Sequence, residues 1–292
     1  MNRVPRTVLL STIAVVLCAS GVHADWYAAR REAMHMANQG QHEEARGAFQ
    51  DLADAATNEH QRSDVLERAA MSTLRLEDHE EALSIAGRIP LAPVRAAVRM
   101  RLLAAQERWD DILEEFKDED FSDWPRSAAG EAHYLRGKAR VELGDREAAL
   151  PDLMEAGRRT ENARVFYDLA EVAAALNRDI VAMDAWRDTQ RALRATGGWM
   201  FYSTVTKRAD TLNRYGKHTH ALAEVEKVDI ERLSGYWLIS MLQRRAAALA
   251  GLGRREEALA DCRRALDTEG INRWQREAVE RVMESLGAEM ED

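Results

Sequence analysis

Two histidines that each precede a pair of glutamates are the residues of this chain best suited to metal-assisted hydrolysis. His42 and His79 begin like the zinc-protease motif, in which one helix carries two histidines four residues apart with a glutamate beside the first. Arg46 and Leu83 stand where the second histidine would have to be. The motif is incomplete at both places, so no zinc site is expected there.

Other chemistry-bearing residues lack the partners that a site needs. His218 and His220 are two potential metal ligands without a third, and such pairs are usually surface histidines. The glycines around residue 252 precede a turn between helices rather than follow a strand, so they do not form a nucleotide loop. Cys262 lies on the inward face of an expected helix, as a small core residue. No nucleophile is paired with a base, so we expect no catalysis, no cofactor and no metal.

The composition is typical of a protein built from long helices. Of the 292 residues, 46% are apolar, 31% are charged and only 6% are aromatic, and five prolines leave long stretches free to be helical. The formal charge is −9. Because a surface of this charge repels polyanions, we expect no nucleic-acid partner.

Residues 1–24 have the three parts of a secretory signal. Arg3 and Arg6 make the start positive, the 12 residues of 8–19 are uncharged and mostly apolar, and Ala24 ends a small-x-small cleavage site. A run of 12 is shorter than the roughly 20 residues that span a membrane. We expect cleavage after Ala24 and an exported protein, periplasmic or secreted, with no transmembrane span in the mature chain.

Cleavage would change the charge and the cysteine count. Removing Arg3 and Arg6 takes the formal charge from −9 to −11, because the removed segment holds no acid. Cys18 would leave with the signal, so Cys262 would stand alone and no intramolecular disulfide could form. A lipoprotein anchored through Cys18 is the alternative; Leu17 disfavours it, because the lipoprotein signal has a small residue directly before its cysteine.

An internal repeat organises the rest of the chain. The segment Ala132–Ala156 predicts two short amphipathic helices joined by a Gly-Asp turn. The position of Ala149, on the second helix of this segment, has an equivalent in each repeat. The equivalent residues are Ala45, Ala82, Ile112, Ala149, Ala182, Ala221 and Ala258, separated by steps of 37, 30, 37, 33, 39 and 37 residues. Such a period is typical of helical repeat proteins, in which each pair buries its apolar faces against the next.

Small residues stand where the two helices of a pair should cross. In the fourth pair these are Gly137 and Ala149, and the third pair departs from the pattern with Met100 and Ile112. In the other pairs the small residue of the first helix is Ala33, Ala70, Ala170, Ala209 or Ala246. Residues that tolerate a left-handed backbone are expected to end the first helices, at Gly40, Gly144, Asn177, Gly216 and Gly253.

This pattern resembles the tetratricopeptide repeat family over residues 25–286. The resemblance implies an all-α fold, a right-handed α-α superhelix (solenoid) of about seven helix pairs with a C-terminal capping helix. We place one repeat domain at 25–292, with repeats near 26–56, 61–89, 93–117, 127–158, 162–194, 199–229 and 235–268, and the capping helix at 272–286. The apolar residues of that last helix are Trp274, Val279, Val282, Met283 and Leu286.

Three features depart from a regular repeat. Residues 117–130 are acidic and contain Pro125, and we expect them to form a loop between repeats. Pro151 falls inside a second helix, where it should cause a kink. The aromatic clusters at 199–202 and 236–238 begin first helices, and we expect them to be core between repeats rather than a ligand platform.

In this family the first helix of each pair lines a concave groove, and the resemblance implies that peptide ligands lie there. Carried over pair by pair, the candidate contacts are Tyr27, Arg30, Met34, Met71, Arg101, Tyr134, Lys138, Arg164, Tyr167, Asn213, Arg214 and Gln243. The same face carries six acids, Asp64, Glu67, Glu131, Glu142, Glu171 and Asp210, against six bases once Arg75 is counted. We therefore expect a charge-balanced groove in which tyrosine contacts matter more than net attraction.

The sequence thus favours an exported, bacterial-type repeat protein, a non-catalytic scaffold that holds a protein or peptide in its groove. The alternative is a structural adaptor that docks on an envelope assembly complex, or self-associates, through its convex face or its ends. The Lys and Asn set with which co-chaperone members of the family bind a C-terminal carboxylate is missing from the corresponding places. A co-chaperone role is therefore not expected.

Overall fold

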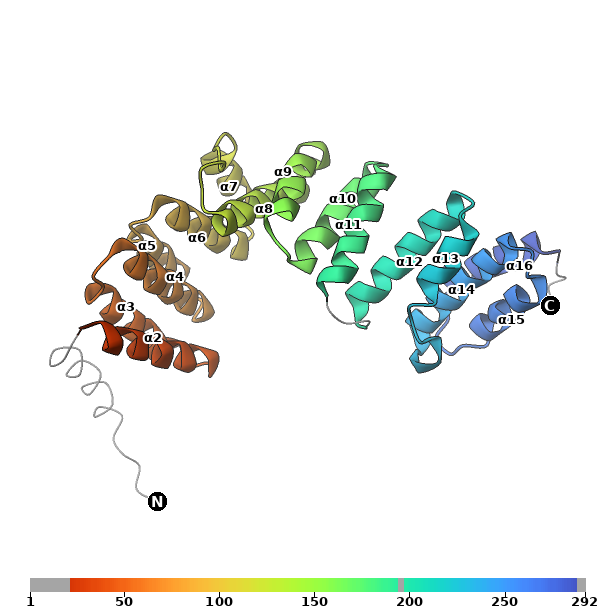
Figure 1. Ribbon diagram of the computed structural model, residues 1–292, viewed down its shortest axis with the longest axis horizontal. Coiled ribbons are helices and arrows are strands. Elements are labelled where there is room, and N and C mark those ends of the chain that lie inside the picture. Colours follow the sequence, from red (N-terminus) through yellow and green to blue (C-terminus); the bar gives the residue numbers. More distant parts are fainter. Residues whose placement is uncertain (1–21, 194–196, 288–292) are drawn as a thin grey trace, which may run out of the picture. The chain divides into compact units, whose positions relative to one another are not determined.

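The computed structural model describes residues 22–193 and 197–287. Over these ranges the chain forms fifteen α-helices, one short 3-10 helix and no strand (Figure 1). The prediction of an all-α fold is confirmed. The expected signal peptide lies outside the described residues, except that α2 begins at Val22 within it, and Cys18 also lies outside them.

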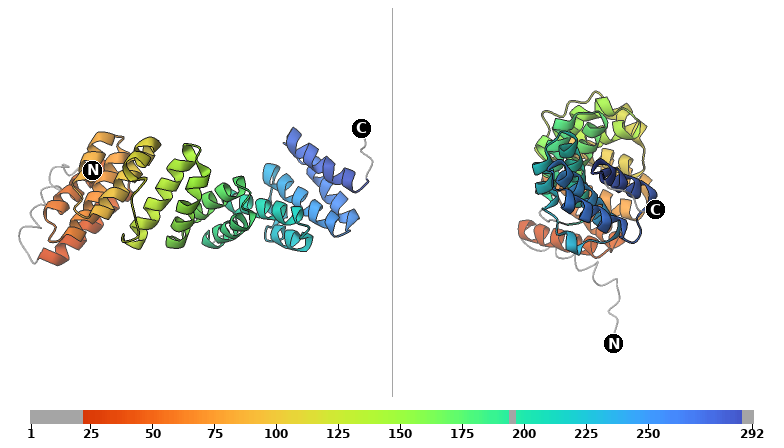
Figure 2. Two further views of the ribbon diagram at one scale, coloured as in Figure 1. Left: turned by 90° about the horizontal axis from the view of Figure 1, so that it is seen from above. Right: turned by 90° about the vertical axis from the view of Figure 1, so that its right-hand side faces the viewer.

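The chain divides into two compact units, Met1–Arg159 and Thr160–Asp292. Within each unit the helices follow one another as pairs joined by short turns, and Figure 2 shows the pairs from two further sides. The pairs of unit 1 are α2 (Val22–Asn38) with α3 (His42–Asp54), α4 (Glu59–Arg75) with α5 (His79–Gly87), α6 (Ala92–Ala105) with α7 (Trp109–Phe116), and α8 (Arg126–Glu142) with α9 (Arg146–Arg159). Unit 2 has α10 (Ala163–Ala175) with α11 (Asp179–Ala192), α12 (Trp199–Arg214) with α13 (His218–Val225), η1 (Ile230–Arg232), α14 (Gly235–Gly251) with α15 (Arg255–Leu266), and α16 (Arg273–Ser285).

Small residues let the two helices of a pair approach closely, as predicted. A Cβ atom on Gly137 of α8 would lie 3.0 Å from Leu153 Cγ and 3.2 Å from Asp152 Cβ of α9. Ala149, on the other side of this crossing, is fully buried. The expected small residues of the other pairs are buried in the same way, namely Ala33, Ala70, Ala170, Ala209 and Ala246.

The turns after the first helices contain the left-handed residues that the sequence predicted, and two that it did not. Gly144 has φ +88° and Asn177 has φ +56°. In the second and third pairs, which lack a glycine there, Glu77 (φ +61°) and Glu107 (φ +56°) take the same conformation. Because non-glycine residues rarely adopt it, the packing of the two helices must determine these turns rather than local preference.

The buried cores run from pair to pair. In unit 1, residues of α2 to α6 form one apolar cluster and residues of α6 to α8 form a second, in which Met100 and Ile112 of the third pair are fully buried. In unit 2 the cluster extends over α12 to α16 and includes Cys262. Burial and the neighbouring Asp261 raise the pKa of the Cys262 thiol to about 11, which agrees with the predicted role as a core residue.

In four of the helix pairs an ion pair between an arginine and a carboxylate joins the two helices, which was not expected from the sequence. In each case 16 residues separate the partners, and the pairs are Arg99–Glu115, Arg136–Asp152, Arg208–Glu224 and Arg245–Asp261. The arginine directly precedes the crossing residue of the first helix, which is small in three of these pairs and Met100 in the third pair of the chain, and the acid comes three residues after the crossing residue of the second helix. This spacing is a signal that could have predicted the pairs.

The break expected over residues 117–130 is shorter than predicted. Helix α8 begins at Arg126, because Pro125 at its N-cap has a φ of −50° that leads into a helix. The Arg126 guanidinium donates to the carbonyl oxygens of Arg158 (2.9 Å) and Arg159 (3.3 Å), which holds the first turn in place. At the other unusual position, α9 runs unbroken through Pro151.

Candidate functional site

Several charged residues on the first-helix face of unit 1, formed by α2, α4, α6 and α8, form ion pairs between successive helices. Arg30 of α2 donates to Asp64 of α4 through Nε and Nη2, at 2.5 and 3.0 Å. Arg101 of α6 donates to Glu67 of α4 (3.0 Å) and to both carboxylate oxygens of Glu131 on α8 (2.6 and 2.5 Å). Burial lowers the pKa of Arg101, but the two carboxylates outweigh this effect and raise its pKa above the ordinary value.

The first-helix face of unit 2, formed by α10, α12, α14 and α16, repeats the arrangement. Lys207 of α12 donates to Glu171 of α10 at 2.6 Å, and Arg244 of α14 donates to Asp210 of α12 at 2.8 Å. Glu171 and Asp210 were expected on this face, whereas their partners Lys207 and Arg244 were not. The partners lie 34 or 36 residues apart, which is about the length of one repeat. An acid followed by a base at that spacing is therefore a sequence pattern that predicts these ion pairs. The balanced charges thus link neighbouring repeats.

Two predicted contacts meet in a hollow of unit 1 of about 340 Å³, which we call the unit 1 hollow. Met34 and Met71 line it, with Phe49 of α3 as a further apolar wall. Arg68 and Arg75 lie on its α4 side. The complete set of lining residues is Met34, Ala37, Asn38, His42, Phe49, Arg68, Met71, Ser72 and Arg75, and it contains no carboxylate.

The polar side chains that line the unit 1 hollow differ in whether they have a hydrogen-bond or ion-pair partner. Arg68 pairs with Asp64 on its own helix at 3.2 Å. Arg75 is exposed and forms no ion pair with any described residue. The Nδ1 atom of His42 is buried without a hydrogen-bond partner in the described part of the chain. An incoming carboxylate could therefore bind Arg75 without displacing an existing partner.

A hollow of about 480 Å³ lies on the first-helix face of unit 2, between α14, α16 and His218, and we call it the unit 2 hollow. Its room comes from small side chains, since Ala247, Ala250, Gly251 and Ala278 are among the lining residues. The others are His218, Gln243, Arg281, Val282, Ser285 and Leu286, again without a carboxylate. Arg281 is exposed and has no ion-pair partner within 22–193 and 197–287.

His220 is exposed, as expected of a surface histidine, whereas His218 is half-buried and packed against α14. The His218 ring lies over Gly251, where a Cβ atom would come within 2.3 Å of His218 Cγ. Its Nδ1 atom lies 3.2 Å from Oδ1 of Asn213, and Nδ2 of the same Asn213 donates to the carbonyl oxygen of Arg244 at 3.2 Å. The predicted contact Asn213 therefore positions His218 at the unit 2 hollow, and only glycine at 251 leaves room for this ring.

The remaining candidate contacts do not gather in either hollow. Lys138 lies over the Trp109 ring at 5.3 Å, and the Tyr167 hydroxyl lies 2.9 Å from Ser203 Oγ. Arg164 pairs with Asp168 on its own helix, and Arg214 lies 3.7 Å from Asp179. Tyr27 is 51% exposed and packs edge-on against Trp26, and Tyr134 packs against the core of unit 1. A contact role for the twelve residues stays a prediction.

The aromatic clusters at the starts of α12 and α14 are only partly core. Phe201 is buried, but Trp199 and Tyr236 are 52% and 58% exposed, and Trp274 at the same place in α16 is 78% exposed. These three lie in the first turn of their helices. The expectation that the clusters are core is therefore wrong for Trp199 and Tyr236, and Trp274 does not join the apolar face of α16.

No helix in the described ranges is long and apolar enough to cross a membrane. Over the same ranges no three His, Cys, Asp or Glu side chains gather in a way that could hold a metal ion.

The chain matches no family model and no curated protein. Among solved structures it is similar to the C-terminal part of a TPR repeat-containing protein from Cytophaga hutchinsonii, with a TM-score of 0.52 at 14% identity over 85% of this chain and 98% of that one. It is also similar to a tetratricopeptide repeat protein from Parabacteroides merdae (TM-score 0.39, 16% identity, 90% and 98% covered). A third is YrrB, described as a TPR protein with an unusual peptide-binding site (0.45, 16%, 74% and 91%).

The likeness to the Cytophaga hutchinsonii protein shows that the fold is of the tetratricopeptide repeat class. It agrees with the helix pairs, the small crossing residues and the ion pairs one repeat apart. At these identities the likeness concerns the fold alone.

Proposed function

We propose that this protein is a non-catalytic scaffold that binds a protein or peptide on its first-helix faces, in the cell envelope or outside the cell. The observation that supports this most is the make-up of the two hollows. The unit 1 hollow contains the predicted contacts Met34 and Met71, and the unit 2 hollow contains the predicted contact Gln243. Both have apolar walls, and both have arginine but no carboxylate among their lining residues.

The proposed ligand presents a carboxylate next to an apolar side chain. The chain carries a formal charge of −9. Hollows that have arginine but no carboxylate among their lining residues therefore differ from the acidic surface of the rest of the chain. Arg75 and Arg281 are exposed and have no described ion-pair partner, which leaves their guanidinium groups available for charge-assisted hydrogen bonds. Met34 and Met71 suit the apolar part, because methionine adapts to varied side chains.

Charge reversal at the two arginines tests this proposal. We expect Arg75→Glu and Arg281→Glu each to weaken binding of a fluorescein-labelled peptide pool rich in Leu and Glu at least tenfold, about 1.4 kcal/mol. Fluorescence anisotropy with the purified mature chain measures the effect. A pool in which Gln replaces Glu should bind weakly to all forms, because it lacks the carboxylate.

The matched controls are Arg62→Glu on α4 and Arg276→Glu on α16. They make the same charge change on the same helices, at exposed arginines outside the hollows. Equal losses in controls and test variants would mean that only long-range charge matters, and unchanged binding in the test variants would contradict the proposal.

Export is the second part of the proposal, and it is supported by the charge, the uncharged run and the cleavage motif of residues 1–24. We expect the protein from fractionated cells to be outside the cytoplasm and to begin at Asp25. N-terminal sequencing together with fractionation measures both. A cytoplasmic protein that retains Met1 would contradict this part and leave the binding proposal to be judged by the peptide titrations.

A further inference from the structure

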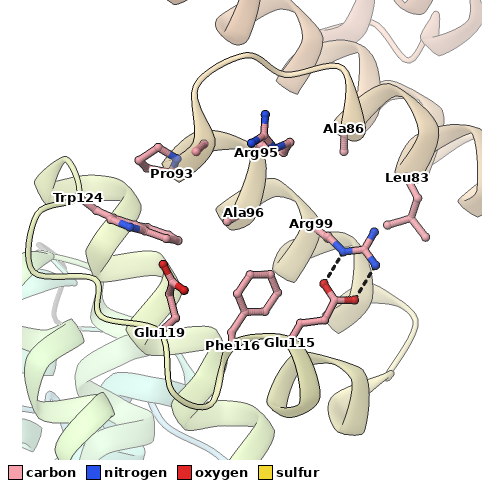
Figure 3. A pocket seen from close by; sticks show the side chains of 12 residues that line it. Leu83, Ala86, Pro93, Arg95, Ala96, Arg99, Glu115, Phe116, Glu119 and Trp124 are labelled. Carbon is pink, nitrogen blue, oxygen red and sulfur yellow. Dashed lines mark hydrogen bonds and ion pairs between the residues drawn. The ribbon is translucent and has the colours of Figure 1, made fainter.

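A hollow of about 490 Å³ opens in unit 1 between the second helices α5 and α7, over the first helix α6 (Figure 3). It exists because α5 and α7 are short, with 9 and 8 residues, whereas α3 and α9 have 13 and 14. The short helices leave the first half of α6 uncovered, and the small residues Ala92 and Ala96 of α6 add room. We call this the second-helix hollow.

Two aromatic side chains line the second-helix hollow. Figure 3 shows Trp124, from the loop before α8, on one side and Phe116, at the end of α7, beside it, with Ala96 behind them. Leu83 and Ala86 of α5 complete the apolar wall. The volume lies within the range of about 300–1,000 Å³ that is common for binding pockets.

The arginines that line this hollow are already bound within the protein. Arg99 donates to both carboxylate oxygens of Glu115, at 2.5 and 2.6 Å. Arg95 donates to the carbonyl oxygen of Ile89 at 2.7 Å, which holds its guanidinium at the turn between α5 and α6. The charge of Arg99 is therefore neutralised by Glu115, whereas Arg95 keeps its charge but has Nη1 held at the turn, bound to the carbonyl oxygens of Ile89 and Pro90.

The acids beside the hollow are, in contrast, not neutralised. Figure 3 shows the Glu119 carboxylate directed into the space next to Trp124. Asp118, Asp120 and Asp123 lie in the same short loop, and none of these four acids forms an ion pair with a described residue. All four are exposed. The entrance therefore attracts a cation, while the interior suits an apolar or aromatic side chain.

We propose that the second-helix hollow docks a short basic segment of a partner protein. The segment inserts one large apolar side chain against Phe116 and Trp124 and places a lysine or arginine at Glu119 and the acidic loop. The partner is identified by charge complementarity. Its basic segment is opposite in charge to the carboxylate-bearing ligand proposed for the first-helix hollows. The second-helix hollow and the first-helix hollows can thus bind different partners on one chain. This inference does not depend on the first-helix proposal.

A set of three labelled peptides tests the proposal. The probe is a fluorescein-labelled Lys-Gly-Trp-Gly-Lys amide; one comparison peptide has Glu in place of both Lys, and the other has Gly in place of Trp. We expect the mature chain to bind the probe with a Kd at least tenfold lower than that of either comparison peptide, as measured by fluorescence anisotropy. No binding of the probe up to about 1 mM, or equal binding of all three, would overturn the proposal.

Variants place the probe on the structure. Ala96→Trp fills the hollow and Glu119→Lys reverses its charge, and each should weaken probe binding at least tenfold. Ala247→Trp fills the unit 2 hollow instead and should leave probe binding unchanged. Thermal unfolding followed by circular dichroism checks that each variant folds; Glu119 is exposed, so its variant serves even if Ala96→Trp is destabilised. Wild-type affinity in Glu119→Lys would contradict the proposal.

Discussion

Replacing Asp152 by alanine is expected to lower the free energy of unfolding by about 3–5 kcal/mol, because it leaves buried cations without their counter-charge. Asp152 is only 4% exposed. It accepts hydrogen bonds from Arg136 at 2.8 and 2.9 Å and from Arg140 at 2.6 Å, and His133 Nδ1 lies 2.9 Å away. Arg136 is itself only 8% exposed, so water cannot fully solvate its guanidinium group once the carboxylate is removed.

The loss should extend beyond the α8–α9 pair. Arg136 also donates to the carbonyl oxygens of Phe116 (3.0 Å) and Glu119 (2.8 Å) and lies over the Phe121 ring at 4.4 Å. Asp152 therefore fixes the arginine that holds the end of α7 and the following loop. Urea unfolding followed by circular dichroism measures the change in free energy.

Asp261→Ala is the matched control. Asp261 occupies the same place in the seventh pair and is 6% exposed, but it accepts from one arginine, Arg245, whose side chain is 29% exposed. Water can solvate that arginine once the carboxylate is gone, so the loss should be less than half of that for Asp152. Equal losses, or a loss below about 1 kcal/mol for Asp152→Ala, would contradict the account of the buried network.

The same carboxylate gives stability a pH dependence. Burial raises the pKa of Asp152, but the hydrogen bonds from His133 and Arg136 and the charge of Arg140 outweigh burial and hold the pKa below its ordinary value. Its contribution is therefore complete above the unfolded pKa of about 3.9 and is lost as the pH falls through the lower folded pKa. Asp152→Asn should accordingly show a shallower fall in melting temperature below about pH 4 than the wild type.

Ala149→Trp is expected to be the second large change, with a loss of about 3 kcal/mol in the free energy of unfolding. Ala149 is fully buried where α8 and α9 cross. The space is tight there, since even a Cβ atom on Gly137 would lie 3.0 Å from Leu153 Cγ. A tryptophan must force the helices apart, so the thermal melt should shift to lower temperature. Glu147→Trp, on the exposed side of α9, is the control and should leave the melt nearly unchanged.

The helix pairs could be predicted because their signals are local. Small residues every three dozen positions mark the crossings, as at Ala149, and glycine marks turns such as that at Gly144. Where packing replaces local preference, the prediction failed or was missing. Glu77 and Glu107 take left-handed conformations that their residue type disfavours, and α8 starts earlier than the acidic stretch suggested.

The candidate site was only partly predictable, because it depends on which side chains meet. Met34 and Met71 come together in the unit 1 hollow, but Arg30 and Arg101 are bound to carboxylates of neighbouring helices. Nor does a repeat pattern reveal where helices are short, and the second-helix hollow beside Trp124 exists for that reason. Pair spacings of 16 and of 34 to 36 residues would have identified the bound charges in advance.

Site-specific photo-crosslinking in intact cells tests the central claim most directly. A photoreactive amino acid is placed at Met71 in the unit 1 hollow or, as a control, at Ile180, which is 82% exposed on the second helix α11. Mass spectrometry then identifies what is attached. The first-helix proposal predicts a protein adduct at position 71 that is absent at position 180 and is lost in the Arg75→Glu background. Adducts of equal yield at both positions, or an adduct at 71 that survives Arg75→Glu unchanged, would contradict it.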